Sequence, residues 1–494
     1  MPRLSAEMLG STRAAVELPR YPRNETGIGH VHLGVGAFMR AHIAVYNDEA
    51  MNIAGGNWSI AGVSLRNATV RDQLRPQDCL YNVAVCDSAA VYYRLIGSIK
   101  SIDVAPDNTD RIVGLIADPA VSVVTLTVTE KGYGLTPDSG ALDTQLGEIA
   151  HDLASLQRPQ STLGFLVAGL IRRRDQGAGP ITIISCDNLP RNSTRLRQAL
   201  LEFVDLACTD IQGWLDENVR FPETMVDRIV PATTHDDLKD AEAGIGLSDA
   251  ALVRTEPFTQ WVIENDFAGP RPAWDKAGAL FVDSVEPYEL AKLRLLNGAH
   301  SALAYLGYLG GHSFIHEAMA DSKYAAYVRY MMTNEISPVT PQPEGMQHAN
   351  YVDALLARFR NTSLRHRTAQ IAMDGSQKLP QRLLNTIRAQ LHCGGPIAGL
   401  SLAVAAWMRY ALGRDEHGRS IDVQDPLATR FADIATRTHD DADETARCFL
   451  QIRSVFGDDL IDEPRFTSLV VEHLANLMQH GAANTVAMFS AQPE

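Results

Sequence analysis

The sequence lacks several features that would place the protein in a specialised class. Its six cysteines show no CxxC or CxxH spacing, which disfavours a zinc site or disulfide framework and predicts reduced, mostly buried thiols. The start has no apolar signal-like segment, and the longest apolar run, residues 396–408, is too short to span a bilayer. Positive charge is not in excess either, since the net charge is −15. We therefore expect a cytoplasmic protein with no membrane or nucleic-acid partner.

The chain is long enough for more than one domain. With 494 residues, two or three domains are expected, and 45% hydrophobic and 21% charged residues are ordinary for a soluble globular protein. An acidic chain can still hold a locally basic site, so anionic substrates are not excluded.

The first motif is His30-Val-His-Leu-Gly34-Val-Gly36-Ala-Phe38-Met-Arg40. A strand before Gly34 and a helix over 41–51 would make the phosphate-cradling turn of a dinucleotide-binding fold, where glycines admit the pyrophosphate. Met39 replaces the usual third small residue, so the generic motif is weak. Arg40 can add a cation at the phosphates. Metal ligation by the nearby histidines is the less favoured interpretation, because their spacing is that of strand and helix face residues.

Alternating strands and helices continue to about residue 190. Such alternation predicts a doubly wound α/β sheet, whose ligands bind beyond the carboxyl ends of its strands. Gly34–Arg40, Glu130 and Asn188 should therefore share one edge, although an asparagine at this position is more often a helix cap or turn former than a catalytic residue. Arg66 stands where an acid usually excludes a 2′-phosphate, or else is a solvated loop residue. The expected elements are strands over 58–65, 83–86, 91–99, 121–128 and 181–186 and a helix over 162–174.

The stretch from Lys292 to Gly310 has the apolar spacing of one helix. In an α-helix Asn297 lies about 140° and His300 about 80° from Lys292, so all three can face one side. The alternative is a partly exposed helix whose polar groups meet solvent or the facing domain. Patterns beyond residue 284 are almost wholly helical, which predicts a Rossmann-type domain over 1–284 and a mainly helical substrate domain over 285–494.

These motifs together resemble the mannitol dehydrogenase family, the polyol-specific long-chain dehydrogenases and reductases. The resemblance covers nearly the whole chain and rests on the glycine-rich turn and on four further motifs: Thr127-Val-Thr129-Glu130-Lys-Gly-Tyr133, Ser185-Cys-Asp-Asn188, Met225-Val-Asp227-Arg228-Ile and Lys292-x4-Asn297-Gly-x-His300. It implies an N-terminal Rossmann-type domain and a helical C-terminal domain, as in 6-phosphogluconate dehydrogenase. Residues 364–368 and 370–382 most resemble the fructuronate reductase (D-mannonate oxidoreductase) branch, since mannitol 2-dehydrogenases should carry arginine at Gln370.

The resemblance also implies roles for individual residues. Lys292 is the expected base, whose ordinary pKa of about 10.4 must be lowered by desolvation. Asn188 and Asn297 would hold the developing oxyanion without zinc, and His300 would orient the substrate and Lys292. Glu130 and Glu289 are candidates for gating a water path for the proton. Substrate contacts are expected at Asp227, Arg228 and Lys378, with mutual pairing as the alternative for Asp227 and Arg228. The expected cofactor site comprises Gly34, Val35, Gly36, Ala37, Phe38, Arg40, Arg66, Thr129 and Glu130.

The expected activity is the zinc-independent interconversion of D-fructuronate and D-mannonate with NAD, or with NADP as second cofactor. Alternatives are a mannitol 2-dehydrogenase or another polyol or tagaturonate reductase. A non-enzymatic NAD-binding sensor should lack the proton-transfer group, and Lys292 is present. The expected partner is a small sugar acid or polyol, and the assembly is a monomer or small homo-oligomer.

Overall fold

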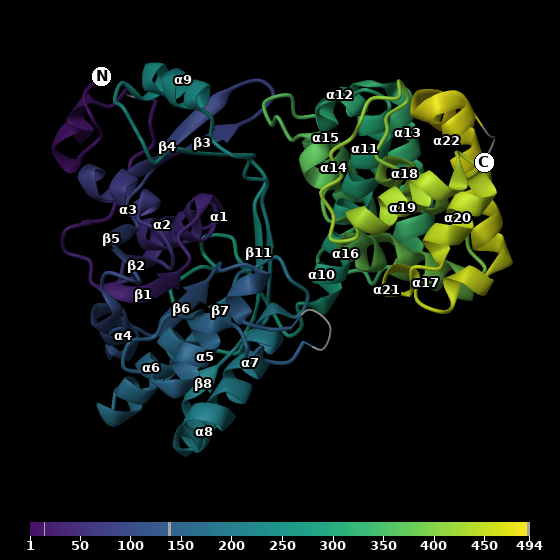
Figure 1. Cartoon of the computed structure of the whole chain (residues 1–494). Helices are drawn as coiled ribbons and strands as arrows, with labels where there is room; N and C mark the ends of the chain where they lie inside the picture. Colours follow the sequence, from purple (N-terminus) through teal and green to yellow (C-terminus); the bar gives the residue numbers. More distant parts are fainter. Residues whose placement is uncertain (14, 137–139, 492–494) are drawn as a thin grey trace. The chain divides into compact units, whose positions relative to one another are not determined.

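The computed structural model describes residues 1–13, 15–136 and 140–491. The chain folds as two compact units, Met1–Glu286 and Pro287–Glu494 (Figure 1). All six cysteines are free thiols; three of them, Cys79, Cys86 and Cys186, are buried. Within the described ranges, no helix has both the length and the apolar composition needed to cross a membrane.

A six-stranded parallel sheet forms the centre of the first unit. Its strand order is β5-β2-β1-β6-β7-β8, which is the doubly wound arrangement expected from the sequence. The strands are β1 (Ile28–Leu33), β2 (Ser59–Ser64), β5 (Ile99–Val104), β6 (Val123–Leu126), β7 (Ile181–Ser185) and β8 (Val219–Arg220). Apolar residues of β1, β6 and β7 pack on helices α4 (Thr109–Ala117), α6 (Thr162–Asp175) and α7 (Asn192–Ala207) (Figure 1).

Two three-stranded sheets complete this unit together with shorter helices. One pairs β10 (Val253–Thr255), β3 (Tyr81–Cys86) and β4 (Val91–Ile96), and the other pairs β12 (Leu280–Val282), β11 (Gln260–Glu264) and β9 (Thr224–Asp227). The remaining α-helices are α2 (Ile43–Ala54), α3 (Thr69–Leu74), α5 (Gly147–Ala154), α8 (Gln212–Asn218) and α9 (His235–Ile245).

Two sequence-based expectations about this unit need correction. The single strand expected over 91–99 is two strands, because β4 ends at Ile96 and β5 begins at Ile99 in a different sheet. The helix expected over 41–51 begins earlier: α1 (Ala37–Ala41) follows Gly36 directly, and α2 begins after a break at His42. The two helices are separate, because His42 has φ −125° and ψ −81°, which lie outside the helical region.

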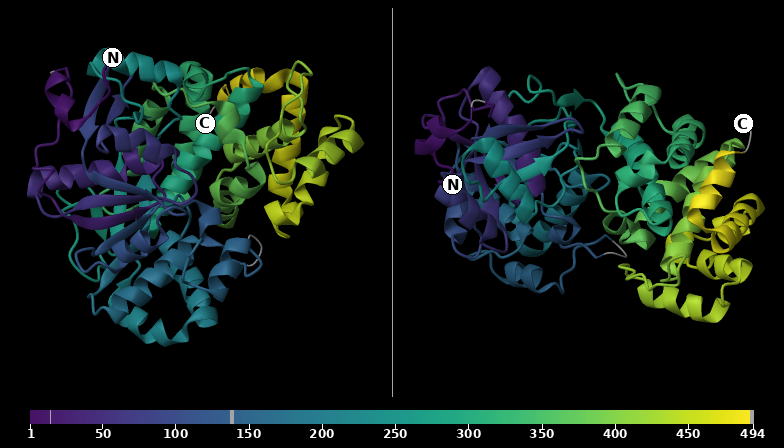
Figure 2. Two further views of the ribbon diagram at one scale, coloured as in Figure 1. Left: turned by 60° about the vertical axis from the view of Figure 1, so that its left-hand side comes forward. Right: turned by 90° about the horizontal axis from the view of Figure 1, so that it is seen from above.

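The second unit is helical throughout its regular structure, as expected. Its C-terminal segment α22 (Pro464–Ser490), which is kinked at Gly481, packs against the buried helix α18 (Ala398–Ala411), and α18 also contacts α11 (Ala299–Leu309) (Figure 2). The other α-helices are α10 (Glu286–Ala291), α12 (Ile315–Ala320), α13 (Ser322–Tyr330), α14 (His348–Phe359), α15 (Thr368–Ala372), α16 (Gly375–Leu379), α17 (Asn385–Cys393), α19 (Ala428–Thr438), α20 (Ala442–Leu450) and α21 (Arg453–Phe456).

Segments of π-helix interrupt the α-helical pattern of this unit. They are η5 (Lys292–Gly298), η6 (Met331–Ile336) and η8 (Pro380–Leu384). The stretch expected as one α-helix from Lys292 to Gly310 is therefore η5 followed by α11. Such π segments are rare and frequently occur at functional sites.

Candidate active site

Three of the motifs singled out in the sequence follow neighbouring parallel strands. The glycine-rich turn follows β1, Glu130 follows β6 and Asn188 follows β7. Because β6 lies between β1 and β7, their carboxyl ends bring these residues to one edge of the sheet. This is the edge at which doubly wound sheets bind their ligands.

The turn after β1 depends on two glycines for different reasons. Gly34 has φ +95°, and a Cβ there would lie 2.2 Å from the carbonyl oxygen of Thr127. Gly34 therefore allows β1 and β6 to approach each other closely. Gly36 has φ −108°, which other residues adopt, and nothing lies within 3.9 Å of a Cβ built on it. Gly36 thus leaves open the space that a pyrophosphate requires above the turn.

A buried chain of hydrogen bonds fixes this turn to the sheet. His30 Nε2 lies 2.6 Å from Thr125 Oγ1, which lies 2.7 Å from His32 Nδ1. His32 Nε2 lies 2.9 Å from Thr127 Oγ1, which donates to the carbonyl of Gly34 at 2.7 Å. Because that last hydroxyl donates, His32 must donate from Nε2 and accept at Nδ1. Burial lowers the pKa of both histidines, and a neutral His32 ring fits this directed chain.

Two arginines expected at the ligand instead contact the backbone around the turn. Arg40 is buried, donates to the carbonyls of Gly36 and Ala251, and lies 5.8 Å from the centre of the Tyr81 ring. Arg228 donates to the carbonyl of Ala41, at the end of α1, and to that of Glu256. Burial lowers the pKa of Arg228 to about 10. These contacts favour a role in holding the turn over a direct contact with phosphate or substrate.

A pocket of about 730 Å³ opens beyond the carboxyl ends of β2 and β5. It is large enough for the nucleoside part of a dinucleotide, which typical ligand cavities of about 300–1,000 Å³ accommodate. Arg66, expected near the cofactor ribose, is exposed and directly follows the lining residue Leu65. The other lining residues include Ala105, Asn108, Arg111, Arg158 and Phe165.

The segment after β6 is fixed by Asp187, a residue that the sequence reasoning did not single out. Its buried carboxylate accepts the backbone N–H groups of Val128 and Thr129. Glu130 follows with an exposed side chain, 3.9 Å from Arg195, and Asn188 is exposed beside Asp187. The motif Ser-Cys-Asp-Asn is visible in the sequence, but the partners of Asp187 are not, because they lie nearly 60 positions earlier in the chain.

In the helical unit, η5 and the start of α11 carry three of the four expected catalytic residues. Lys292, Asn297 and His300 are all buried, with exposed fractions of 8%, 9% and 7%. In a π-helix residues i and i+5 are linked by the backbone hydrogen bond, so Lys292 and Asn297 lie one above the other. The separation of about 140° expected from α-helical geometry is therefore wrong. The two polar groups share a face more closely than the sequence predicted.

A second π-helix, η8, carries Arg382, one of the cations near His300. η8 packs against η5, and a Cβ on Gly298 would lie 2.9 Å from the carbonyl oxygen of Arg382, so Gly298 allows this approach. Arg382 donates to Ser301 at 3.0 Å. The His300 ring lies 4.7 Å from that of His366, centre to centre. Burial lowers the pKa of His300, and His366, Arg382, Arg358 and Lys378 lower it further.

Lys378 lies within a group of basic side chains, which we call the basic cluster: His300, Arg358, His366, Lys378 and Arg382. Burial and then Arg382 lower the pKa of Lys378 to about 8, and its Nζ donates to the carbonyl of Met373 at 2.5 Å. Arg365 and Arg367, in the segment 364–368 that resembles the fructuronate reductase branch, lie outside this cluster. Both are exposed, and Arg367 lies over the Phe314 ring at 5.9 Å.

Comparison with known proteins agrees with this division of the chain. A model of the mannitol dehydrogenase Rossmann domain matches residues 28–276, and a model of the mannitol dehydrogenase C-terminal domain matches residues 284–478. The chain belongs to the mannitol dehydrogenase family. It is therefore an oxidoreductase of that family.

Several relatives in this family align over almost the whole chain. The D-mannonate oxidoreductase of Escherichia coli is 42% identical over 92% of this chain and 94% of its own. A mannitol 2-dehydrogenase of Phaeosphaeria nodorum is 39% identical over 96% of this chain and 84% of its own. The structure of Pseudomonas fluorescens mannitol 2-dehydrogenase with NAD and D-mannitol has a TM-score of 0.88 at 36% identity, covering 99% of this chain and 100% of that one.

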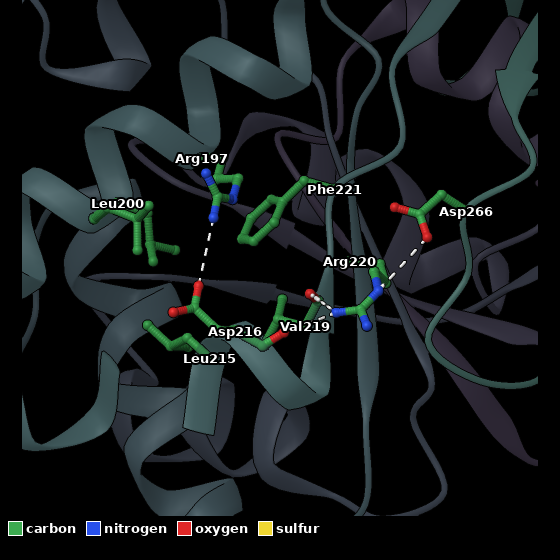
Figure 3. Close-up of a pocket in the computed structure, with 9 residues that line it drawn as sticks. Arg197, Leu200, Leu215, Asp216, Val219, Arg220, Phe221 and Asp266 are labelled. Atoms are coloured by element: carbon green, nitrogen blue, oxygen red, sulfur yellow. Dashed lines mark hydrogen bonds and ion pairs between the residues drawn. The ribbon is translucent and has the colours of Figure 1, made fainter. Parts of the chain in front are cut away.

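The first unit of this mannitol dehydrogenase family member also has a smaller pocket of about 250 Å³ (Figure 3). This pocket is separate from the edge of the sheet where the carboxyl ends of the strands lie. It lies beside β8, where Val219 pairs with Ile181 at the start of β7. Arg197 and Asp216 are 3.4 Å apart across it, and Arg220 and Asp266 are 3.6 Å apart. Its position at the other end of the strands separates it from the candidate active site.

Proposed function

We propose that the protein interconverts D-fructuronate and D-mannonate, a keto-sugar acid and its aldonate, with NAD(H). The observation that carries this proposal is the basic cluster around His300, to which Arg358, Lys378 and Arg382 contribute cationic side chains. A sugar-acid carboxylate is an anion, and charge-assisted hydrogen bonds to it are roughly twice as strong as neutral ones. The 42% identity to a D-mannonate oxidoreductase supports the same substrate class.

The first unit fits NAD as cofactor. Gly36 leaves open space over the turn, and the pocket beside Leu65 lies at the edge expected for the nucleoside. Gly34 to Phe38, Arg66, Thr129 and Glu130 would line this site, with Arg40 supporting the turn. NAD(H), when bound, accepts or supplies the hydride. Arg66 tolerates a 2′-phosphate, so NADP is the second cofactor.

Residues of both units have roles in the proposed reaction. Lys292 takes the hydroxyl proton of the alcohol and returns it in the reduction, as a general base and acid. Asn188 and Asn297 donate to the oxygen that becomes negatively charged, which is the task of an oxyanion site. His300, held beside Phe359 and His366, orients the substrate hydroxyls. Asp227 is a secondary substrate contact in this scheme, whereas Arg228 supports the turn through its bond to the carbonyl of Ala41.

The test compares kcat/KM for fructuronate and fructose with NADH at one pH. We expect the uronate to be preferred by at least about tenfold, equivalent to about 1.4 kcal/mol. Arg382→Leu should lower kcat/KM for fructuronate more than for fructose. Arg365→Leu is the matched control, because this arginine of the same unit is exposed and outside the basic cluster.

The competing function is that of a mannitol 2-dehydrogenase. The similarity to the Pseudomonas fluorescens enzyme, whose structure contains NAD and D-mannitol, favours it. Equal kcat/KM values for the two substrates, or a preference for fructose, would assign the protein to that function. Lys378 would then bind a neutral hydroxyl.

A further inference from the structure

Thr129 has a backbone conformation that threonine rarely adopts. Its φ is +67° and its ψ is 167°, in a region occupied almost exclusively by glycine. Threonine is β-branched, so its Cβ is especially crowded there. Such a conformation persists only where the surrounding structure imposes it, and it is found most often at active sites and ligand clamps.

The side chain of Asp187 accepts hydrogen bonds from the backbone at this position. Its Oδ1 accepts the N–H of Thr129 at 2.9 Å, and its Oδ2 accepts the N–H of Val128 at 3.1 Å. The hydroxyl of Tyr133, at the end of the same segment, donates to Oδ2 at 2.8 Å. A carboxylate has acceptors on both oxygens, which is what two consecutive N–H groups need.

The backbone of Asp187 is also held in place. Its N–H donates to Ser185 Oγ at 3.3 Å, and its carbonyl accepts from Asn192 Nδ2 at 3.0 Å. Asp187 is only 8% exposed and directly precedes the exposed Asn188. One fixed residue therefore determines the positions of Thr129, after β6, and Asn188, after β7.

We propose that Asp187 is a positioning residue of the active site, which holds Thr129 in its strained conformation and thereby sets the wall of the cofactor site relative to Asn188. This inference rests on the proposed function, because that function assigns Thr129 to the cofactor and Asn188 to the reacting oxygen. In this scheme Asp187 is assigned no direct contact with the cofactor or with the reacting oxygen.

A double-mutant cycle tests the proposal with Asp187→Asn, Thr129→Gly and the double variant. The amide introduced by Asp187→Asn would present a donor to one of the two N–H groups, so threonine at 129 loses its support. We expect Asp187→Asn to lower kcat/KM at least about tenfold when residue 129 is threonine. Because glycine adopts the conformation unaided, the same change should cost less than about threefold in the Thr129→Gly background. Equal losses in the two backgrounds would overturn the proposal.

NADH affinity, followed by fluorescence, separates this role from a purely structural one. Asp187→Asn should weaken NADH binding and lower kcat, whereas Asp48→Asn should lower the melting temperature with kcat unchanged. Asp48 is the matched control: it is buried and accepts from Tyr21 at 2.6 Å and from Gly97 at 3.0 Å, next to the start of β5 and away from the carboxyl edge. Equal kcat losses in the two variants would contradict the proposal.

If Asp187→Asn does not fold, Thr129→Gly and Thr129→Ala provide the test. Both lose the threonine side chain, but only glycine adopts the observed conformation freely, so Thr129→Gly should melt at the higher temperature. The reverse order would overturn the proposal. Failure of the proposed function is distinguishable, because it would appear in the wild-type protein, which would then bind no NADH, reduce no substrate or show no preference for fructuronate over fructose.

Discussion

Replacing either glycine of the turn after β1 by alanine separates folding from cofactor binding. At Gly34 the new Cβ would lie 2.2 Å from the carbonyl oxygen and 2.8 Å from the carbonyl carbon of Thr127. Both are backbone atoms, so no side-chain rotation relieves the overlap. At Gly36 the nearest atom is 3.9 Å away and φ is −108°.

The loss in free energy of unfolding caused by Gly34→Ala can be estimated from these contacts. A left-handed φ costs an alanine about 1–2 kcal/mol. Moving Thr127 away would weaken its N–H bond to Leu33 at 2.9 Å and its hydroxyl bond to Gly34 at 2.7 Å, each worth about 1 kcal/mol. The sum is about 3–4 kcal/mol. For a unit of this size, that corresponds to a fall in melting temperature of at least about 6 °C.

Gly36→Ala should instead melt within about 2 °C of wild type, because the folded turn has room for the methyl group. It should bind NADH at least about tenfold more weakly, about 1.4 kcal/mol, because the methyl group occupies the space above the turn. Thermal melts and NADH fluorescence titrations of both variants provide the measurements. Wild-type NADH affinity in Gly36→Ala would show that this turn does not cradle the phosphates, and wild-type stability in Gly34→Ala would refute the steric argument.

Three further predictions concern the helical unit. Lys292→Ala should lower kcat at least about 100-fold with NADH affinity unchanged, and a kcat within tenfold of wild type would exclude Lys292 as the base. Burial lowers the pKa of Lys378 to about 8, so its positive charge is lost as pH rises through that value; KM for fructuronate should then increase, while KM for fructose changes little. Burial raises the pKa of Glu335 to about 7, above its ordinary value of about 4.3, so the folded state binds the proton more tightly. Its contribution to the free energy of unfolding is complete below about pH 4 and is lost as pH rises through about 7. Glu335→Gln should remove this pH dependence from the free energy of unfolding measured in denaturant titrations.

The sequence predicted most of what local pattern determines. The strand expected over 181–186 is β7 (Ile181–Ser185), and the helix expected over 162–174 is α6 (Thr162–Asp175). Both have continuous apolar or periodic patterns that specify the element without reference to the rest of the chain. The two strands within 91–99 were not separated, because their assignment to different sheets depends on distant partners: β4 pairs with β3 and β5 with β2.

Interactions between distant segments were not predictable in the same way. Asp187 stabilises a segment that begins at Val128, and only the adjacency of β6 and β7 brings the two together. Likewise, an arginine beside a glycine-rich turn is typical of a phosphate-binding residue, and the sequence therefore predicted that role for Arg40. The carbonyl of Ala251, more than 200 residues later, accepts its hydrogen bond and turns the guanidinium inward.

The π-helix at Lys292 shows why residue spacing alone did not predict how closely Lys292 and Asn297 share one face. The interval from Lys292 to Asn297 suits an i to i+5 hydrogen bond, but the sequence offers no reason to prefer that bond over the α-helical one. Packing in the folded structure favours the π-helical bond, because Gly298 has no side chain and the backbone of η8 at Arg382 can therefore pack closely against η5. The same approach brings Arg382 to Ser301, next to His300. A side chain at residue 298 should therefore disturb the lysine–asparagine pair and the basic cluster together, coupling proton transfer to recognition of the substrate carboxylate.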